Sequence, residues 1–477
     1  MYFTYTIALR TIAPVYSGSG CTMQMLFTIN SFKLVLLALV ALLAVVIWRY
    51  SATALAGETD KPRFMRALAA TLAAVVFTLL SNHLLLFWLG WVGISLALQQ
   101  LLLFYPERPR AQLAAHKKAL SARLGETLLA LAFALLYLQF DTASISQINQ
   151  LLSSADAANP MLHSAAVLLV LVALLKCAQL PLHGWLIQVV EAPTPVSALL
   201  HAGIINLGGI LLLLFAPLLG YSAIASSLLL ITALVSTVLA ALIMSTRISI
   251  KVRLAWSTVA QMGLMLVEIA LGLYTLALLH LLAHSCYKAY AFLHSGNAVN
   301  HYLAAQLAGQ TQPRAWHWLL SLLLAAGLLG LTQLLLPLAS LSSAVLLVLA
   351  ITVLLAPALM NADNRRMQRL LLALAYAIGL LALYFSLKTL LQPVMPTPHS
   401  ISLAADLLSS IAFAGLFILA LLLRYQSHHK TMNKVFIWLN AGGYLDEWAT
   451  RITLKIWPYS ARQAAEEHKM AALQELK

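Results

Sequence analysis

Thirteen apolar runs, each about long enough to cross a lipid bilayer as a helix, occupy most of the chain after residue 33. A helix of roughly 20 apolar residues spans a hydrocarbon core of about 30 Å. Lipid offers no partner to backbone polar groups, so spanning segments must be helices or closed barrels. We therefore predict an all-α polytopic membrane protein with about 13 transmembrane helices, at 34–50, 67–81, 83–104, 119–140, 163–180, 196–216, 222–244, 254–272, 274–296, 317–336, 340–360, 370–391 and 403–423.

Composition excludes a soluble domain. The 477 residues are 62% hydrophobic and only 9% charged, with a mean hydropathy of +0.88. Three widely spaced cysteines (Cys21, Cys177 and Cys286) form neither a disulfide framework nor a CxxC metal site. The basic residues behind the net charge of +14 flank the apolar spans and do not form a patch on a soluble fold. We therefore interpret them as signals for membrane orientation and expect no nucleic-acid partner.

The basic residues predict the orientation, because they fall in alternate loops while loops 141–162 and 392–402 contain no Lys or Arg. The positive-inside rule then gives a multi-pass protein of the cell inner membrane with a cytoplasmic C-terminus. We expect an N-terminal extension of unclear role at 1–33, without a recognisable signal peptide, and the helical bundle at 34–424. The tail at 425–477 is rich in Trp and charge, which fits either an interfacial amphipathic helix or a surface that docks a cytoplasmic partner.

One stretch, residues 176–206, places polar groups at membrane depth. Lys176 ends an apolar run, and Pro181 removes a backbone donor and should break the helix. A broken helix is tolerated where it is buried in protein or lines a wet cavity, and an intramembrane lysine indicates a functional site. Glu191 and His201 follow within the same discontinuity. The alternative is a helix kinked by proline whose lysine snorkels to the interface.

A second polar group comes from His280, His284 and Lys288, which recur every four residues and so share one helix face. Such a face favours a hydrated proton or ion path. Structural histidines satisfied between helices are the alternative. Zinc binding is disfavoured, since no third ligand lies near the pair in the sequence.

Other charged residues are candidates for coupling or contact. Arg123 and Glu126 lie one helical turn apart, which fits a local ion pair or a part in gating. Glu268 and Asp406 are acids in apolar spans without a partner that the sequence identifies.

Several segments resemble the antiporter-like subunits of respiratory complex I and Mrp-type sodium/proton antiporters, over about residues 82–302. The residues that carry the resemblance are Lys176 before the break, Pro193-Thr-Pro-Val-Ser-Ala-Leu199 with His201, the run HLLAHSCYKAYAF from His280 to Phe292, and Lys251-Val-Arg-Leu-Ala-Trp-Ser-Thr258 with Gln261-Met-Gly263. The resemblance implies an antiporter-like bundle in which these lysines and histidines form an ion path, and it adds Lys251 to the candidates.

Several differences from the pumping subunits indicate which branch of that family this sequence resembles. Pumping subunits pair the broken-helix lysine with a glutamate in a GWEGVG-like motif, and here Val92 occupies that position. The spans within 317–360 contain no Lys or Arg to match the late-span lysine of pumping subunits, and we expect no long lateral helix after residue 424. These features, with Phe104-Tyr-Pro-Glu-Arg-Pro109 and Ala115-His-Lys-Lys118, resemble the Dab-type membrane subunits of inorganic carbon transporters.

This resemblance implies a transporter subunit, not an enzyme, in which a flow of protons or sodium drives CO2 hydration in a large partner. That partner, DabA, resembles a zinc carbonic anhydrase, so the resemblance implies no cofactor in this chain and zinc in the partner. The alternatives are a divergent proton-translocating subunit of complex I or an Mrp antiporter, and a non-conducting membrane anchor.

Overall fold

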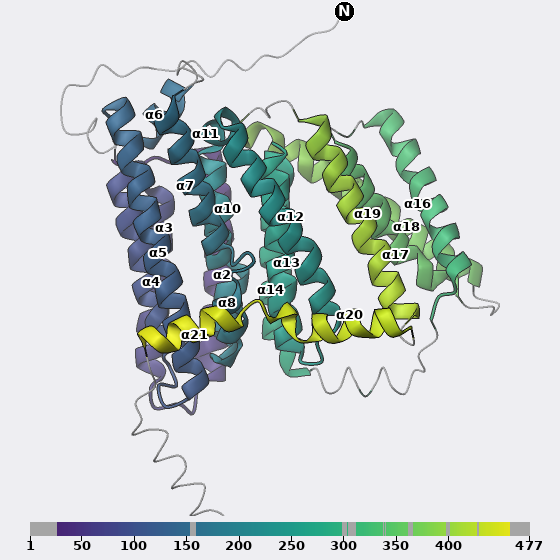
Figure 1. Ribbon diagram of the computed structural model, residues 1–477, viewed down its shortest axis with the longest axis horizontal. Coiled ribbons are helices and arrows are strands. Elements are labelled where there is room, and N and C mark those ends of the chain that lie inside the picture. The colour runs from purple at the N-terminus through teal and green to yellow at the C-terminus, as the bar shows by residue number, and fades with distance from the viewer. Residues whose placement is uncertain are drawn as a thin grey trace, which may run out of the picture.

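A computed structural model describes residues 26–152, 159–297, 303, 312–336, 338, 340–360, 366–396, 401–426 and 429–457. Most of the predicted N-terminal extension and the last 20 residues lie outside these ranges. The described residues form a helical bundle with its long helices side by side (Figure 1). The long helices are α2 (Ser31–Ala54), α3 (Lys61–Leu80), α4 (Leu84–Leu102), α5 (Pro109–Phe140), α12 (Ala223–Ser245), α13 (Ile250–Ala270), α14 (Tyr274–Leu293), α16 (Ala315–Leu335), α17 (Leu341–Ala358), α18 (Arg366–Leu391) and α19 (Leu403–Tyr425).

Two further membrane crossings are built from shorter pieces. The first descends through α7 (Pro160–Lys176), α8 (Gly184–Gln188) and the 3-10 turn η2 (Val189–Glu191). The second ascends through α9 (Thr194–Ala202), the turn η3 (Ile204–Asn206) and α10 (Leu207–Leu214). Short helices α6 (Ile145–Leu151) and α11 (Ala216–Tyr221) lie at the end of the bundle shown uppermost in Figure 1.

The predicted spans match the helices. Twelve helices of the described chain are long and apolar enough to cross a membrane, and the shorter apolar helix Pro160–Lys176 corresponds to the remaining prediction. The prediction of an all-α bundle with about 13 spans and a broken helix near Pro181 is therefore confirmed. The largest difference is at α5, which begins at Pro109, ten residues before the predicted start at 119. Lys117 and Lys118 lie in this added part and are buried against protein, so their charge does not end the helix.

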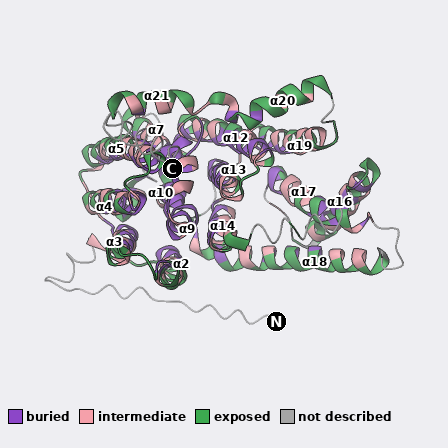
Figure 2. Cartoon of the chain, turned by 90° about the horizontal axis from the view of Figure 1, so that it is seen from below, coloured by how far each residue is buried: buried purple, intermediate pink, exposed green. Residues whose placement is uncertain are grey.

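Apolar packing divides the bundle into two clusters. The larger extends from α2 through α14 and includes Phe413 of α19 and Leu439 of α20. The smaller lies among α16, α17 and α18 around Ala325, Leu355 and Phe385. Buried residues concentrate on α7, α10, α13 and neighbouring helices, whereas α18 is largely exposed along its length (Figure 2). The broken crossings therefore lie in the best-packed part of the molecule.

After α19 the chain turns and runs across the bundle (Figure 1). This segment consists of α20 (Lys430–Asn440), the turn η6 (Gly442–Tyr444) and α21 (Glu447–Ile456), and we call residues 430–456 the C-terminal strap. Arg247 in the α12–α13 loop donates to the carbonyl oxygen of Asn440, over 2.9 Å. The strap therefore lies at the end of the bundle that carries this basic loop, which we call the basic end.

Candidate functional site

The break after α7 is a short non-helical segment held by side chains from neighbouring helices. Cys177 caps α7, Ala178 has a positive φ of 51°, and a cis peptide bond joins Leu180 to Pro181. Ser236 accepts a hydrogen bond from the Leu180 amide, and the Gln179 amide group donates to the Cys177 carbonyl oxygen at 2.8 Å. Backbone groups freed from a helix within a membrane need such partners, so these contacts allow the break to exist there.

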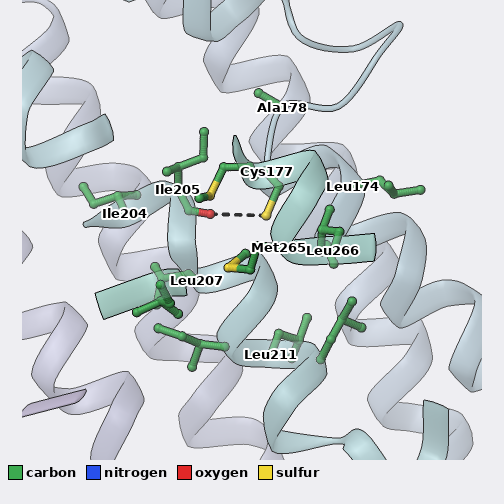
Figure 3. Packing of buried hydrophobic residues seen from close by; sticks show 14 of the residues in the cluster. Leu174, Cys177, Ala178, Ile204, Ile205, Leu207, Leu211, Met265 and Leu266 are labelled. Carbon is green, nitrogen blue, oxygen red and sulfur yellow. Dashed lines mark hydrogen bonds between the residues drawn. The ribbon is translucent and has the colours of Figure 1, made fainter. Parts of the chain in front are cut away.

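The two broken crossings contact each other at their interruptions. Cys177 Sγ lies 3.4 Å from the Ile205 carbonyl oxygen in η3, and Figure 3 shows the pair surrounded by Leu174, Leu207 and Met265. Gly208 permits this approach, because a Cβ there would lie 2.6 Å from Cys177 Sγ. The sequence predicted the first interruption from Pro181. The second interruption follows Gly203. A glycine within an apolar run does not by itself predict a break, so the sequence did not identify this one.

Lys176, immediately before the break, borders a small internal cavity. Its ammonium lies 4.5 Å from the centroid of the Trp91 ring on α4, a cation–π arrangement. Ser95, Lys118 and Lys176 are polar residues of the cavity wall, and the volume open to the centres of water-sized spheres is about 30 Å³. A site of this size and polarity can hold water, so the lysine has room to exchange a proton.

Two charged residues of α5 act on Lys176. Glu126 is buried and interacts electrostatically with both Lys176 and Lys118. Its carboxylate also pairs with Arg123 at 2.9 Å, and the Arg123 side chain is half exposed. Lys118 donates to the Ser95 carbonyl oxygen at 2.8 Å. The predicted local pair of Arg123 and Glu126 is thus present, and the structure places it beside Lys176.

Lys288 forms the centre of a second polar cluster, between α13 and α14. Its side chain is fully buried, and its ammonium donates to Ser257 Oγ at 2.6 Å and to the Leu254 carbonyl oxygen at 2.9 Å. Neither contact neutralises a charge. In the described part of the chain Lys288 has no acidic partner within salt-bridge distance, which suits a group that gains and loses a proton.

Two buried histidines lie beside Lys288. His201 accepts or donates through Nδ1 to Thr258 Oγ1 at 3.1 Å and stacks on Phe292 with ring centroids 4.4 Å apart. Neither ring nitrogen of His284 has a hydrogen-bond partner among the described residues, and the same holds for His201 Nε2. Buried polar atoms normally have partners. These nitrogens are therefore free to form a hydrogen bond with water.

His280 extends the cluster toward the α13–α14 turn. Its Nδ1 lies 3.0 Å from Glu268 Oε2 and its Nε2 lies 2.8 Å from Gln261 Oε1. The His280 and His284 ring centroids are 6.2 Å apart. Glu268 had no partner that the sequence identified, because twelve residues and a helix turn separate it from His280. The structure makes it the acidic end of the row of titratable groups.

At the basic end a polar vestibule of about 410 Å³ opens beside the Pro193–Pro195 turn. Its charged and polar lining includes Glu58, Tyr105, Arg108, Glu191 and Lys251. Lys251 donates to Thr194 Oγ1 at 3.1 Å, at the start of α9. Lys251 lies one turn of α13 from Leu254, whose carbonyl oxygen accepts from Lys288.

Two contacts shape the outer part of the vestibule. Arg110 lies 3.5 Å from Glu191 in an exposed ion pair. The Tyr105 hydroxyl donates to Glu58 at 3.1 Å. Partial burial, with the hydrogen bond and the charge of Glu58, raises the pKa of Tyr105, so its phenol stays neutral at physiological pH.

The predicted site residues therefore fall into two groups. Lys176, Glu126 and Arg123 form one, and His201, His280, His284 and Lys288 form the other, with Lys251 and Glu191 at the vestibule. His201 was expected beside Lys176 across the break, and the structure places it beside Lys288 instead, because α9 runs on toward α14. No group of three or more His, Cys, Asp or Glu in the described ranges could hold a metal ion.

Asp406 has a structural explanation. Its carboxylate accepts hydrogen bonds from the amides of Leu341 and Ser342 at 2.7 and 2.9 Å, so it caps the N-terminus of α17 from another helix. This is a common way to satisfy free amides at a helix start and requires no role in an ion path.

Sequence comparison gives consistent relatives. The protein family described as "NADH:quinone oxidoreductase/Mrp antiporter, TM" matches residues 81–312. The chain is 46% identical, over 90% of its length and 83% of the relative, to "Probable inorganic carbon transporter subunit DabB" of Hydrogenovibrio crunogenus. It is 36% identical, over 91% of its length and 81% of the relative, to subunit DabB2 of Halothiobacillus neapolitanus.

Structural comparison agrees on the fold. A chain of the Mrp complex from Dietzia superposes with a TM-score of 0.53 at 21% sequence identity, covering 86% of this chain and 50% of the other. At this identity the likeness establishes the shared antiporter-like architecture and no more.

Proposed function

The chain belongs to the DabB family of inorganic carbon transporter subunits, and from this membership we propose that it is the cation-conducting, energy-coupling membrane subunit of an inorganic carbon uptake complex. The observation that carries the proposal is the row of buried titratable side chains at membrane depth. Burying such groups costs several kcal/mol unless they are hydrated or paired. A protein that only anchored a partner would have no reason to bury titratable groups at this cost.

The conducting path that we propose begins at the vestibule. A cation, which we take to be a proton, passes from the Lys251 region to Lys288 and then to His201 and His284. It leaves through His280 and Glu268 at the opposite end of α14. Three observations support this order. Lys288 donates to Ser257 and to the Leu254 carbonyl oxygen, one turn from Lys251. It interacts electrostatically with His201 and His284, and the His284 ring packs beside His280.

Lys176 is proposed as the switch that couples this path to the break. A lysine in a small polar cavity can alternate between a charged and a neutral state. When charged it is stabilised by Glu126 and by the face of Trp91. When neutral it leaves Glu126 to Arg123 and Lys118. Such a change beside a non-helical segment gives the protein two electrostatic states, which a coupled transporter requires.

The partner that we propose is a large zinc-binding subunit that hydrates CO2, docked at the basic end of the bundle. The outer side of the strap supports a docking role, since Phe436, Ile437, Trp448 and Ile452 are exposed there. The zinc would belong to that partner. The proposed orientation, with the basic end in the cytoplasm, follows the positive-inside rule.

A direct test replaces Lys176 in cells that lack carbonic anhydrase and carry this chain with its large partner. Lys176→Ala should abolish growth in ambient air and uptake of labelled inorganic carbon, because the titrating group is gone. Lys176→Arg should fail as well, since an arginine keeps its charge at any physiological pH and cannot switch.

The matched control is Arg63→Ala, which removes an exposed basic residue from the start of α3, outside the strap that we propose for docking. It should grow normally, and all three variants should reach the membrane in equal amounts. Full carbon uptake by Lys176→Ala would remove this residue from the mechanism.

The family match also favours a second candidate, a proton-translocating subunit of complex I or an Mrp antiporter. The two candidates differ in what they need. Carbon uptake requires the zinc partner, whereas antiport by an Mrp-type assembly would appear as sodium-driven proton movement in vesicles without it.

A further inference from the structure

The strap returns to the broken helix through one acidic side chain, Asp446. Its Oδ2 accepts from Lys117 Nζ at 2.7 Å and from the Gln188 side-chain amide at 3.2 Å. Gln188 is the last residue of α8. Lys117 lies on α5, 329 positions before Asp446 in the chain. Lys117 also donates to Thr450 on α21 at 2.6 Å. The carboxylate thus joins three separate elements.

The shape of the contact is as specific as its charge. Gly184, the first residue of α8, has no side chain, and the Asp446 carboxylate occupies the space that a Cβ would need. No larger residue could stand at 184 without displacing it. His183, just before this glycine, is buried and interacts electrostatically with Asp446.

Contacts on both sides keep Asp446 in place. Before it, Arg247 donates to the Asn440 carbonyl oxygen, and Gly442 packs against the Arg247 guanidinium with a left-handed φ of 71°. After it, the Trp457 ring stacks on His116 with centroids 4.3 Å apart and planes 8° from parallel. The strap therefore stays attached to the bundle without Asp446. We expect a change at Asp446 to affect mainly its contacts with α5 and α8.

The same part of α5 connects the strap to the Lys176 cavity. Lys117 faces Asp446, and the next residue, Lys118, donates to the Ser95 carbonyl oxygen and lines the cavity with Lys176. Successive residues of a helix point about 100° apart. A shift of α5 toward or away from the strap would therefore move Lys118 relative to Lys176.

We propose that Asp446 is a positioning residue for the broken helix: it fastens α8 to α5 and to the strap, and its release lets the break open toward Lys176. Asp446 Oδ1 is buried and has no hydrogen-bond partner in the described chain, so only one of the two carboxylate oxygens holds the contact. The contact is therefore weaker than one in which both carboxylate oxygens accept hydrogen bonds. The proposal rests on the proposed function only in making Lys176 the residue that the opening exposes.

Cys177 offers a direct reporter, because its thiol is fully buried at the break beside Lys176. In full-length protein reconstituted in vesicles, with Cys21→Ser and Cys286→Ser, Cys177 is the single thiol. Its reaction with methanethiosulfonate ethylammonium then measures how often the break opens. Asp446→Asn removes the charge, and Gly184→Ala displaces the carboxylate without changing any charge. Each should speed labelling about tenfold, the effect of losing about one charge-assisted hydrogen bond.

Matched variants separate opening of the break from general loosening. Glu447→Gln alters the adjacent acid, which forms an exposed ion pair with Arg451, and Gly327→Ala adds a methyl group where nothing in the described chain lies within 4 Å. Both should label at the original rate. A cysteine placed by Ala325→Cys in the smaller cluster, in a Cys177→Ser background, reports global loosening and should label no faster with Asp446→Asn.

The double variant Asp446→Asn with Gly184→Ala should label no faster than either single variant, since both break one contact. Unchanged Cys177 labelling in both single variants, or equal acceleration at Ala325→Cys, would overturn the proposal. Neither result depends on transport. A failure of the Lys176 variants to affect carbon uptake would overturn the proposed function and leave the labelling result intact.

Discussion

Lys176 has an acidic neighbour even though the expected glutamate is replaced by Val92. The resembled subunits supply this acid from the GWEGVG-like motif, which here lies on α4. Glu126 comes from α5, where Gly125 and Glu126 are buried toward α7. A nearby opposite charge stabilises the charged lysine whichever helix carries it. We propose that Glu126, on α5, is the acidic partner of Lys176 in place of that glutamate.

Glu126→Gln should therefore reduce coupled carbon uptake by about tenfold or more. The loss follows from electrostatics, because an opposite charge at close range changes the balance between charged and neutral lysine by on the order of 1–4 kcal/mol. Uptake of labelled inorganic carbon at matched protein levels measures it.

Glu107→Gln is the matched control, since Glu107 is an exposed acid in the α4–α5 loop. Arg123→Gln should cost less than Glu126→Gln, because Arg123 is half exposed and its pair is screened by solvent. Normal uptake by Glu126→Gln would show that Lys176 needs no acidic partner.

Among the elements, α17 depends on a charge from its neighbour. Asp406 of α19 satisfies two free amides at the start of α17, and both bonds are short. Asp406→Ala should lower stability by about 1–2 kcal/mol, the usual cost of losing a capping side chain. In detergent this should appear as a fall of a few degrees in melting temperature.

Asp406→Asn retains one acceptor oxygen and should cost less. Carbon uptake at low temperature should stay near normal in both variants, because the capping contact lies outside the proposed path. A loss of uptake with unchanged melting temperature would instead give Asp406 a role in conduction.

Sequence could predict the elements far better than their contacts. Apolar length identifies the spans, and Pro181 identifies the first break, because both are local properties. The spacing of His280, His284 and Lys288 likewise predicts a shared face. Glu268 could not be paired with His280, nor Asp446 with Lys117, because those contacts depend on how distant helices pack. The same reason explains why His201 was expected beside Lys176.

At the scale of the whole molecule, the two polar groups lie in the better-packed part of the bundle and the strap passes across its basic end (Figures 1 and 2). The α16–α18 cluster has its own apolar core and contributes none of the titratable residues of the candidate path. The proposed path thus lies between α4 and α14, and the strap proposed for docking packs against α5 and α12 of the same region.

This arrangement makes a test between a conductor and an anchor possible. An anchor must insert and bind its partner, and it needs no titratable row. A conductor needs His280, His284 and Lys288, whose contacts run from Ser257 to Glu268 through the interior. Replacing all three by alanine removes groups that face protein, so insertion should persist.

We expect the triple variant His280→Ala, His284→Ala, Lys288→Ala to lose carbon uptake while still co-purifying with its large partner. An uncoupler that collapses the proton gradient should stop the unaltered protein in the same way if protons are the coupling ion, whereas a sodium ionophore should not. The control is Tyr290→Ala, which changes an exposed residue of the same helix. A triple variant that still accumulates inorganic carbon would make this chain an anchor, since none of the titratable groups on α14 would then be needed for its work.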